Sequence, residues 1–201
     1  MSTKRIGIFG GTFNPPHIGH IAAARACVER LGLNLLLMIP TNIPPHKKLP
    51  EGAASPRQRY EMTEIAASMI PMAKACDIEI NRIGPSYTAD TVEQLKGMYP
   101  ESCLWLVVGT DMLSSFERWR QPEKIASFCR LAAVARSEGD IEIIDHKARE
   151  LRKSLGAHVD IVHNTAVEGS STEFRMGGRE ELVPSEIRRY IRKNGLYSGR
   201  I

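Results

Sequence analysis

Residues 6–20 are the stretch of the sequence that most constrains the fold. They read Ile-Gly-Ile-Phe-Gly-Gly-Thr-Phe-Asn-Pro-Pro-His-Ile-Gly-His. A short apolar run ends in two glycines, a turn with two prolines follows, and an apolar-periodic segment then begins. This order predicts a buried strand, a tight turn, and a helix that carries His17 and His20 on one face of its first turn. A strand end beside a helix N-terminus is where α/β proteins commonly bind a phosphate group.

The glycines at positions 10 and 11 lack the neighbours that define two common nucleotide-binding motifs. No Gly-Lys-Ser/Thr follows them, which excludes the usual P-loop, and the absence of Gly-x-Gly-x-x-Gly disfavours a nicotinamide-dependent dehydrogenase. What remains is a turn whose backbone a ligand can approach, with two imidazoles at the positive end of a helix dipole. This arrangement favours an anion. A metal held by His17 and His20 is the weaker alternative, because no third ligand stands nearby.

Apolar strands and amphipathic helices alternate along nearly the whole chain. The pattern predicts an α/β fold, a doubly wound, mostly parallel Rossmann-like sheet of five to six strands with helices on both faces. The expected strands are 4–9, 34–39, one around Ile78 and Ile80, 103–108, 131–135 and 159–162. The expected helices are 17–31, 56–70, 89–98, one bearing Phe116 and Trp119, 122–128, 141–155, a short one opened by 170–172, and 184–194 with Gly195 as its C-cap.

The size and composition fit one compact domain. The 201 residues are 42% hydrophobic and 25% charged, which is enough apolar content for a real core. One domain and one domain with a small subdomain both remain open. We expect a single domain over 1–201, with 165–201 as a helical subregion. The segment 40–56 holds five prolines, and a loop of this length is usually functional or mobile.

The charge and the cysteines indicate the kind of partner and compartment. A net charge of +4 suits an anionic small molecule as readily as a nucleic acid, and we expect no nucleic-acid partner. Four cysteines stand far apart in or beside apolar stretches, which predicts buried free thiols in a reducing cytosol; they are Cys27, Cys76, Cys103 and Cys129. No secretion signal opens the sequence, and no run approaches the roughly 18 apolar residues of a membrane span. We therefore expect a cytoplasmic protein, and a homo-oligomer remains open.

Two motifs carry a resemblance to a known family. His17-Ile18-Gly19-His20 resembles the HxGH signature of the nucleotidyltransferase superfamily, and the string from Gly10 to His20 resembles that of bacterial nicotinate mononucleotide adenylyltransferases, which make deamido-NAD. The family's second signature, Ser-Ser-Thr-x-x-Arg, is similar to residues 170–175. Further matches follow in the family's order across 6–197: Pro44-Pro45-His46-Lys47, Ser86-Tyr87-Thr88, Gly109-Thr110-Asp111, Trp119, Leu182-Val183-Pro184 and Leu196-Tyr197.

The resemblance implies a reaction in which the phosphate of nicotinate mononucleotide attacks the α-phosphorus of ATP and pyrophosphate leaves. The nucleophile is a phosphate monoester with a second pKa of about 6, so it is mostly dianionic near neutral pH and needs no general base. Catalysis should then consist of positioning and charge stabilisation. Mg²⁺ is expected on the ATP phosphates, because no dedicated carboxylate cage is evident in the sequence.

The resemblance also implies a role for each matching residue. The implied catalytic residues are His17, His20 and Arg175. The implied ATP-binding residues are Gly10, Gly11, Thr12, Phe13, His20, Gly109, Asp111, Ser171, Thr172 and Arg175. The implied acceptor-binding residues are Asn14, His46, Lys47, Tyr87, Thr88, Trp119 and Arg136.

Several of these residues also have a purely structural interpretation. Asp111 could cap a helix, Trp119 could pack in the core, and the Tyr87–Thr88 segment could be a turn that caps the next helix. The pair His46 and Lys47 could form a solvated basic loop, and 170–175 could be an N-cap with a surface arginine. Arg136 is followed here by Ser-Glu, where the family usually has Pro-Gly.

One departure from the family lies directly after the second signature. Residues 176–183 form a shorter connection than the family commonly has, and Gly177 and Gly178 are poor helix formers. The sequence predicts that the short helix ends at once and that an altered loop follows an intact phosphate cap.

Other functions stay open at this point. Nicotinamide mononucleotide or phosphopantetheine could be the acceptor, although Trp119 and the second signature disfavour the latter. A non-catalytic nucleotide-binding module would most simply have lost the histidine pair, and a tRNA-charging enzyme would need a further domain.

Overall fold

The computed structural model describes residues 4–45, 48–164 and 169–197. All its strands belong to one six-stranded sheet in the order β3-β2-β1-β4-β5-β6, and every pair of neighbours is parallel. The strands are β1 (Arg5–Gly11), β2 (Leu35–Pro40), β3 (Ala73–Ala75), β4 (Cys103–Gly109), β5 (Cys129–Ala135) and β6 (Val159–His163). This confirms the doubly wound α/β fold. The strand order reverses between β1 and β4, which opens a crevice at their carboxyl ends.

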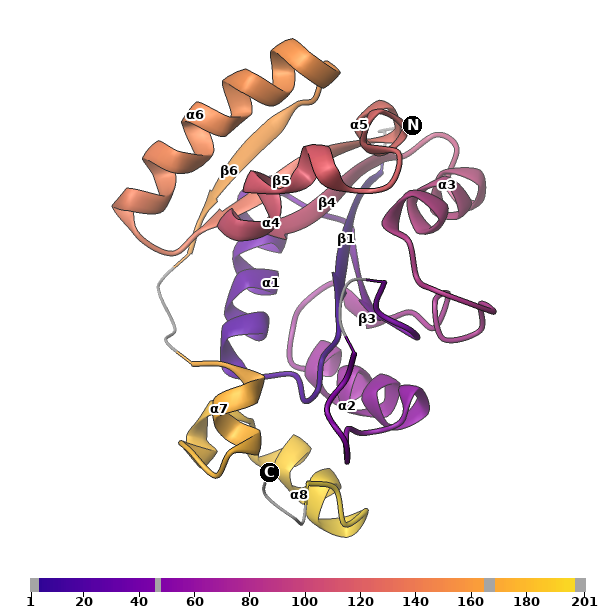
Figure 1. The fold of residues 1–201 in the computed structure, drawn as a ribbon, viewed down its shortest axis with the longest axis vertical. Helices are drawn as coiled ribbons and strands as arrows, with labels where there is room; N and C mark the ends of the chain where they lie inside the picture. Colours follow the sequence, from indigo (N-terminus) through magenta and orange to yellow (C-terminus); the bar gives the residue numbers. More distant parts are fainter. Residues whose placement is uncertain (1–3, 46–47, 165–168, 198–201) are drawn as a thin grey trace.

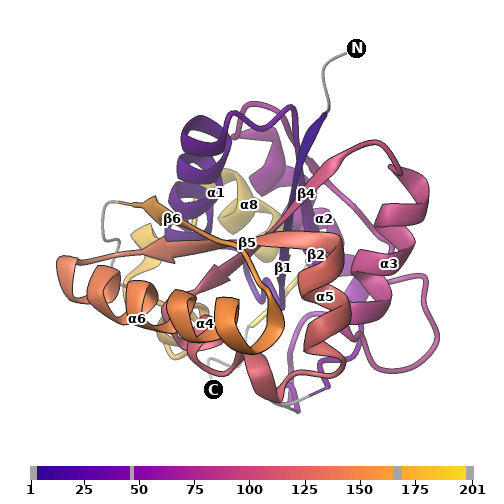
Figure 2. The ribbon, with the colours of Figure 1, turned by 90° about the horizontal axis from the view of Figure 1, so that it is seen from above.

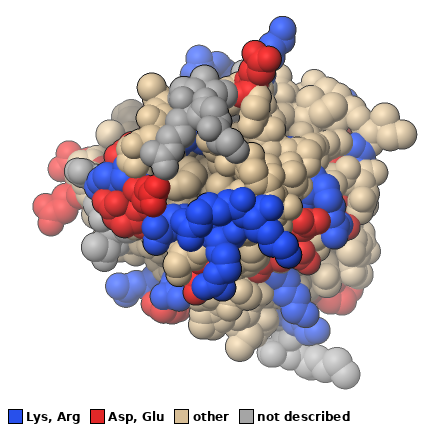
Figure 3. All heavy atoms as spheres, turned by 90° about the horizontal axis from the view of Figure 1, so that it is seen from below, with Lys and Arg blue, Asp and Glu red and all other residues tan. Residues whose placement is uncertain are grey.

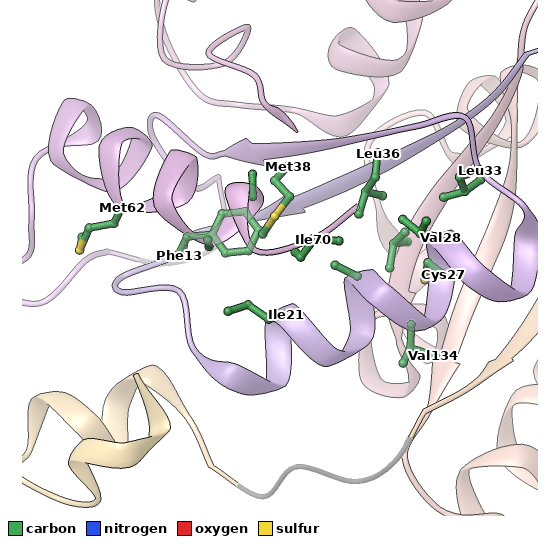
Figure 4. Close-up of a cluster of buried hydrophobic side chains, with 14 of the residues drawn as sticks. Phe13, Ile21, Cys27, Val28, Leu33, Leu36, Met38, Met62, Ile70 and Val134 are labelled. Atoms are coloured by element: carbon green, nitrogen blue, oxygen red, sulfur yellow. The ribbon is translucent and has the colours of Figure 1, made fainter. Parts of the chain in front are cut away.

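Helices cover both faces of the sheet (Figures 1 and 2). The α-helices are α1 (Ile18–Leu31), α2 (Pro56–Ser68), α3 (Thr88–Met98), α4 (Thr110–Ser114), α5 (Pro122–Phe128), α6 (Glu138–Leu155), α7 (Ser171–Arg175) and α8 (Ser185–Lys193). Two short 3₁₀ helices, η1 (Phe116–Arg118) and η2 (Glu180–Leu182), complete the elements. One core cluster joins the sheet to α1, α2 and α8, and the other joins it to α3, α4, α5 and α6. Figure 4 shows part of the first cluster. No helix of the described ranges is long and apolar enough to cross a membrane.

Local sequence signals account for most helix ends. The hydroxyl of Ser55 accepts a hydrogen bond from the backbone N–H of Gln58, and Pro56 occupies the first helical position of α2, as predicted. At the C-terminal end of α1, Gly32 adopts the left-handed conformation (φ 58°) that ends a helix without strain. These two signals mark where α2 begins and where α1 ends.

The structure corrects four expectations. The third strand is Ala73–Ala75, and residues 78–80 form turns instead, because Glu79 is held there, buried, by the Thr91 hydroxyl. The expected helix around Phe116 and Trp119 is divided into α4 and η1, with Trp119 just beyond.

The other two corrections concern single positions. Cys103 is exposed, since it opens β4 at the rim of the sheet, whereas Cys27 and Cys129 are buried and Cys76 is partly buried. The C-cap of α8 is Asn194. Gly195 follows it in the left-handed conformation.

Candidate active site at the carboxyl edge of the sheet

The two predicted phosphate-binding motifs of the sequence lie at the crevice between β1 and β4. β1 ends at Gly11 and β4 at Gly109, which lie on adjacent strands. α1 starts beside them, and its 14 residues direct the positive end of the helix dipole into this region. The sequence-predicted site residues that follow β1 and β4 therefore lie at one edge of the sheet.

Both histidines of the first motif use their Nδ1 atoms to cap α1. His17 is the N-cap, and its Nδ1 accepts the backbone N–H of Gly19 at 3.1 Å. The Nδ1 of His20 accepts the backbone N–H of His17 at 3.2 Å. An imidazole that accepts at Nδ1 carries its proton on Nε2 when neutral. The two rings lie 3.7 Å apart, so the helix start presents two neighbouring N–H donors.

The electrostatics keep His17 neutral. Burial, together with the smaller effect of the nearby positive charge of Arg136, lowers its pKa from 6.5 to about 4. This result also places Arg136, which follows β5, close to the first motif. A neutral imidazole near a cation is suited to donate a hydrogen bond to an anion rather than to form an ion pair.

The two glycines that end β1 are explained by different features of their surroundings. A side chain at Gly10 would meet no atom within 4 Å, so this position is open toward the site. A Cβ at Gly11 would lie 2.9 Å from the ring of Phe13. The Phe13 ring is 1% exposed and packs near Ile21 and Met38 in the core (Figure 4). A nucleotide contact from Phe13 is therefore expected only through its main chain.

Asn14 joins the first motif to the end of the chain. Its side chain is 3% exposed, and its Oδ1 accepts the backbone N–H of Ala54 and the hydroxyl of Tyr197. Arg175 Nη1 donates to the Asn14 main-chain oxygen at 2.6 Å, and the Ser171 hydroxyl donates to the Pro15 oxygen at 2.8 Å. The two signatures thus form one clamp. The Asn14 side chain supports the clamp, and only its Nδ2 lacks a hydrogen-bond partner among the described residues.

The second signature opens α7 as its sequence predicts. Ser170 is the N-cap, and its hydroxyl accepts the backbone N–H of Glu173. Thr172 accepts a hydrogen bond from Arg175 Nη2 at 3.1 Å. The helix ends at Arg175, and Gly177 follows with φ 80°. The prediction of a helix that ends at once is confirmed.

Three of the residues expected to bind the acceptor, Tyr87, Thr88 and Trp119, lie on two segments that contact each other. The guanidinium of Arg120 lies over the ring of Tyr87, 4.4 Å from its centroid, which brings the Tyr87–Thr88 segment next to Trp119. The Trp119 ring is half-buried and lies 5.3 Å from that of Phe116. Trp119 therefore takes part in the core and keeps a partly exposed surface. Two further expected residues, His46 and Lys47, lie outside the described residues.

A hydrogen-bonded pair of loops closes the side of the crevice beyond β4. Asp111 lies exposed in the first turn of α4. The carboxylate of Asp140, at the start of α6, accepts the backbone N–H of Arg136 at 2.8 Å and the hydroxyl of Thr110. These contacts hold the segment after β4 against the segment after β5. They leave Arg136 exposed and near His17.

The surface around the clamp is basic. Figure 3 views the end of the molecule where α7 and α8 lie, and Lys and Arg side chains gather across the middle of this face. α8 alone carries three arginines and a lysine. Among the described residues, no group of three or more His, Cys, Asp or Glu side chains could hold a metal ion. The basic face is suited to an anionic ligand.

Sequence reasoning missed two buried charged residues beside the site, Arg59 and Glu79. Both are buried, at 0% and 6% exposure. A signal for Arg59 exists in the sequence, since it stands on the same face of its helix as Met62, Thr63 and Ala66. A cation in such an apolar row indicates an internal partner. Glu79 lies in a turn segment, where no periodicity marks it.

Comparisons with known proteins show the family of the chain. The cytidylyltransferase-like family model matches residues 8–177. A probable nicotinate-nucleotide adenylyltransferase of Carboxydothermus hydrogenoformans is 36% identical over 202 residues, which cover 98% of this chain and 100% of the relative. A protein of the same description from Neisseria meningitidis is 35% identical, with coverages of 96% and 98%.

A solved structure shares the fold. The Plasmodium falciparum nicotinic acid mononucleotide adenylyltransferase complexed with NaAD superposes with a TM-score of 0.75 over 97% of this chain and 98% of the other, at 18% identity. At this identity the likeness concerns the architecture. The sequence relatives, by contrast, match at over 30% identity along nearly their whole lengths. The chain belongs to the nicotinate-nucleotide adenylyltransferase family of cytidylyltransferase-like proteins.

Proposed function

We propose that this protein transfers the adenylyl group of ATP to nicotinate mononucleotide and so forms deamido-NAD and pyrophosphate, a step of NAD biosynthesis. The observation that carries the proposal is the clamp at the crevice. Two imidazole N–H donors stand at the start of α1, and Arg175 reaches the same turn from α7. This is a set of donors for a polyphosphate, held rigidly on two elements.

The reaction needs these donors more than it needs a base. The attacking group is a phosphate monoester that is largely dianionic above its second pKa of about 6. The barrier therefore lies in bringing two anions together and in the charge that builds on the leaving pyrophosphate. We propose that His17, His20 and Arg175 stabilise this charge. Their fixed positions supply the stabilisation without reorganisation during the reaction.

The remaining predicted residues divide between the two substrates. We propose that ATP contacts the end of β1 and the turn after it, the end of β4 and the segment after it, and α7. The proposed residues are Gly10, Gly11, Thr12, Phe13, Gly109, Asp111, Ser171 and Thr172. We propose that the acceptor lies between the Tyr87–Thr88 segment and Trp119, whose half-exposed indole fits a flat pyridine ring. Asn14, His46, Lys47 and Arg136 complete the proposed acceptor site.

ATP is proposed to arrive as its Mg²⁺ complex, as suits the metal-assisted ATP chemistry that is general for nucleotidyltransferases. The donor set of imidazoles and guanidinium groups is suited to phosphate oxygens and not to Mg²⁺, which prefers oxygen ligands. The metal would neutralise phosphate charge while bound to the substrate. We further propose a single domain whose C-terminal helical subregion, which includes α7 and α8, carries the second signature. We also propose a cytoplasmic location, where the four unpaired cysteines stay reduced.

Release of pyrophosphate from ATP and Mg²⁺ tests the proposal, with nicotinate mononucleotide, nicotinamide mononucleotide and phosphopantetheine as acceptors. We expect release with the nicotinate nucleotide, at a higher kcat/KM than with the other two. Omission of Mg²⁺ should abolish the release. No release with nicotinate mononucleotide would refute the proposed function, and a preference for nicotinamide mononucleotide would replace the acceptor while keeping the chemistry.

A further inference from the structure

Arg59 is the largest fully buried side chain among the described residues, with 0% exposure. Arginine is almost never buried to this extent without partners, because a desolvated charge is costly. Burial lowers the pKa of the Arg59 guanidinium, and the electrostatic effect of the nearby Tyr197 and Glu79 side chains opposes this shift. An arginine stays protonated under such conditions. The fold therefore retains a full positive charge on the buried side of α2, next to the proposed site.

The partners of Arg59 are three main-chain oxygens from three separate segments. Its Nη1 donates to the Thr12 oxygen at 2.9 Å, and its Nη2 donates to the Asn42 oxygen at 3.1 Å. Its Nε donates to the Ala54 oxygen at 3.3 Å. None of these partners is a carboxylate, so the contact is not an ion pair. The side chain instead fastens loops to one another.

The loops that Arg59 joins belong to the two halves of the site. Thr12 lies on the turn after β1, where ATP is proposed to bind. Asn42 lies on the segment after β2, which holds the acceptor side: the Asn42 N–H donates to the Ser86 hydroxyl at 3.1 Å, and the Ser86 N–H donates to the Ile43 oxygen at 2.9 Å. Ser86 directly precedes the Tyr87–Thr88 segment.

A second buried group supports the acceptor side of this connection. The Glu79 carboxylate accepts a hydrogen bond from the Thr91 hydroxyl at 2.7 Å, and the Ser86 and Thr41 hydroxyls lie near enough to lower its pKa. Thr41 in turn donates its backbone N–H to the Gly11 oxygen at 2.9 Å. The connection between the two halves thus runs through buried polar groups rather than through apolar packing.

We propose that Arg59 is a positioning residue that sets the distance between bound ATP and the acceptor phosphate. The inference rests on the proposed function. Only a planar fork of donors reaches three oxygens at once, so a lysine, with one ammonium group, cannot replace it. The in-line attack on the α-phosphorus depends on the spacing of the two substrates, and a misplacement of about 1 Å can lower a rate about 100-fold.

A positioning role predicts a separation of binding from turnover. Arg59→Lys and Arg59→Met leave the residues of each half-site in place, so the Kd for ATP and for nicotinate mononucleotide, each measured alone, should change by no more than about threefold. The kcat should fall by about 10- to 100-fold in both variants, since each leaves the two turns without their shared anchor. The lysine variant should not restore kcat.

A matched control separates this effect from a loss of stability. Leu151, on α6, is also fully buried but belongs to the core cluster on the other face of the sheet. Leu151→Ala should lower the Tm while leaving the kcat of the folded protein at its original value. Each variant is compared at a temperature where circular dichroism shows it folded.

A further variant keeps the test decisive if the Arg59 variants do not fold. Ser86→Ala removes the hydroxyl that accepts from Asn42, and it leaves no buried charge unpaired at Arg59. It should show the same separation, with kcat lowered and the Kd for ATP unchanged.

Two results are distinguishable from one another. If the unaltered protein uses a different acceptor, the proposed function fails and the measurements are made with the acceptor it uses. If folded Arg59→Lys and Arg59→Met, or Ser86→Ala in their place, keep the original kcat, the positioning role is overturned.

Discussion

Arg175 donates a hydrogen bond of 2.6 Å to the main-chain oxygen of Asn14, a residue 161 positions earlier in the chain. The contact joins the second signature to the turn of the first, and the Ser171–Pro15 hydrogen bond lies beside it. The fold itself therefore holds the arginine against the turn. Such preorganisation is what charge stabilisation requires.

Replacement of Arg175 tests the clamp directly. Arg175→Ala should lower kcat/KM by about 100- to 1,000-fold, the range found when one preorganised charge-stabilising donor is removed. Arg175→Lys should recover only part of this loss, because one ammonium group cannot donate to Asn14 and a phosphate as a fork does. Steady-state pyrophosphate release measures both variants. The control is Arg179→Ala, which breaks an exposed ion pair with Glu173. A variant Arg175→Ala with kcat/KM near that of the original protein would remove Arg175 from the catalytic set.

The pH dependence of the rate should follow the acceptor phosphate and not a histidine. With a pKa of about 4, His17 is neutral from mildly acidic to alkaline pH and donates through Nε2 throughout. The rate should then fall only below about pH 6, where the acceptor phosphate becomes protonated. Nuclear magnetic resonance of labelled histidine follows the His17 ring, with His17→Gln used for assignment. A titration of His17 near neutral pH, together with a rate that rises through the same pKa, would contradict the donor role.

The same shift has a sign for stability. The folded pKa of His17, about 4, lies below its value of 6.5 in the unfolded chain. As the pH falls, the unfolded chain takes up the proton first, so His17 lowers the free energy of unfolding progressively between those two values. Thermal unfolding at a series of pH values should show a smaller loss of Tm in His17→Gln than in the original protein over this window. An equal loss in both would mean that His17 titrates alike in the two states.

The two glycines at the end of β1 should respond differently to alanine. Gly11→Ala places a methyl group 2.9 Å from the Phe13 ring, and overpacking of this kind costs about 1–3 kcal/mol of stability. Gly10→Ala meets no protein atom within 4 Å, so its Tm should be unchanged while its KM for ATP rises by about tenfold, as backbone approach is blocked. Thermal unfolding and steady-state kinetics on both variants check this. If Gly10→Ala keeps its KM for ATP, the nucleotide does not approach this position.

Glu79 provides a stability test with the opposite pH direction. Burial raises the pKa of its carboxyl, and the Thr91 hydrogen bond opposes the shift. Because the folded pKa lies above the unfolded value of 4.5, the fold favours the protonated form, and the charge lowers the free energy of unfolding as the pH rises through the folded pKa. The Tm of Glu79→Gln relative to the original protein should therefore increase from acidic to neutral pH. Glu29→Gln, on exposed α1 surface, is the matched control, and a relative Tm that falls with pH would contradict the interpretation.

The strands could be predicted because each central one is a nearly continuous apolar run. β2 and β5 are examples, and both are buried on their two faces. β3 could not be found in this way, since it is a three-residue edge strand with a lysine at its centre. The isoleucines at 78 and 80 suggested alternation, but a tertiary hydrogen bond to Glu79 decides the local structure there.

The site divides in the same manner. The two signatures could be identified from residue type and spacing, because His17 and Ser170 cap the helices that they open. The contacts between Arg175 and Asn14, or between Arg120 and Tyr87, join residues that no local pattern relates. The role of a buried polar residue is set by carbonyl oxygens on distant loops, and such partners emerge only when the chain is folded.

The hydroxyl of Tyr197 donates to Asn14 Oδ1 at 2.6 Å, across 183 positions. During synthesis, the turn that follows the first strand therefore emerges from the ribosome long before the residue that fastens it. An incomplete chain could assemble the whole sheet and still lack this fastening, since all six strands precede residue 164. The turn after β1 is in this way fastened only after the segment beyond the last strand has been made.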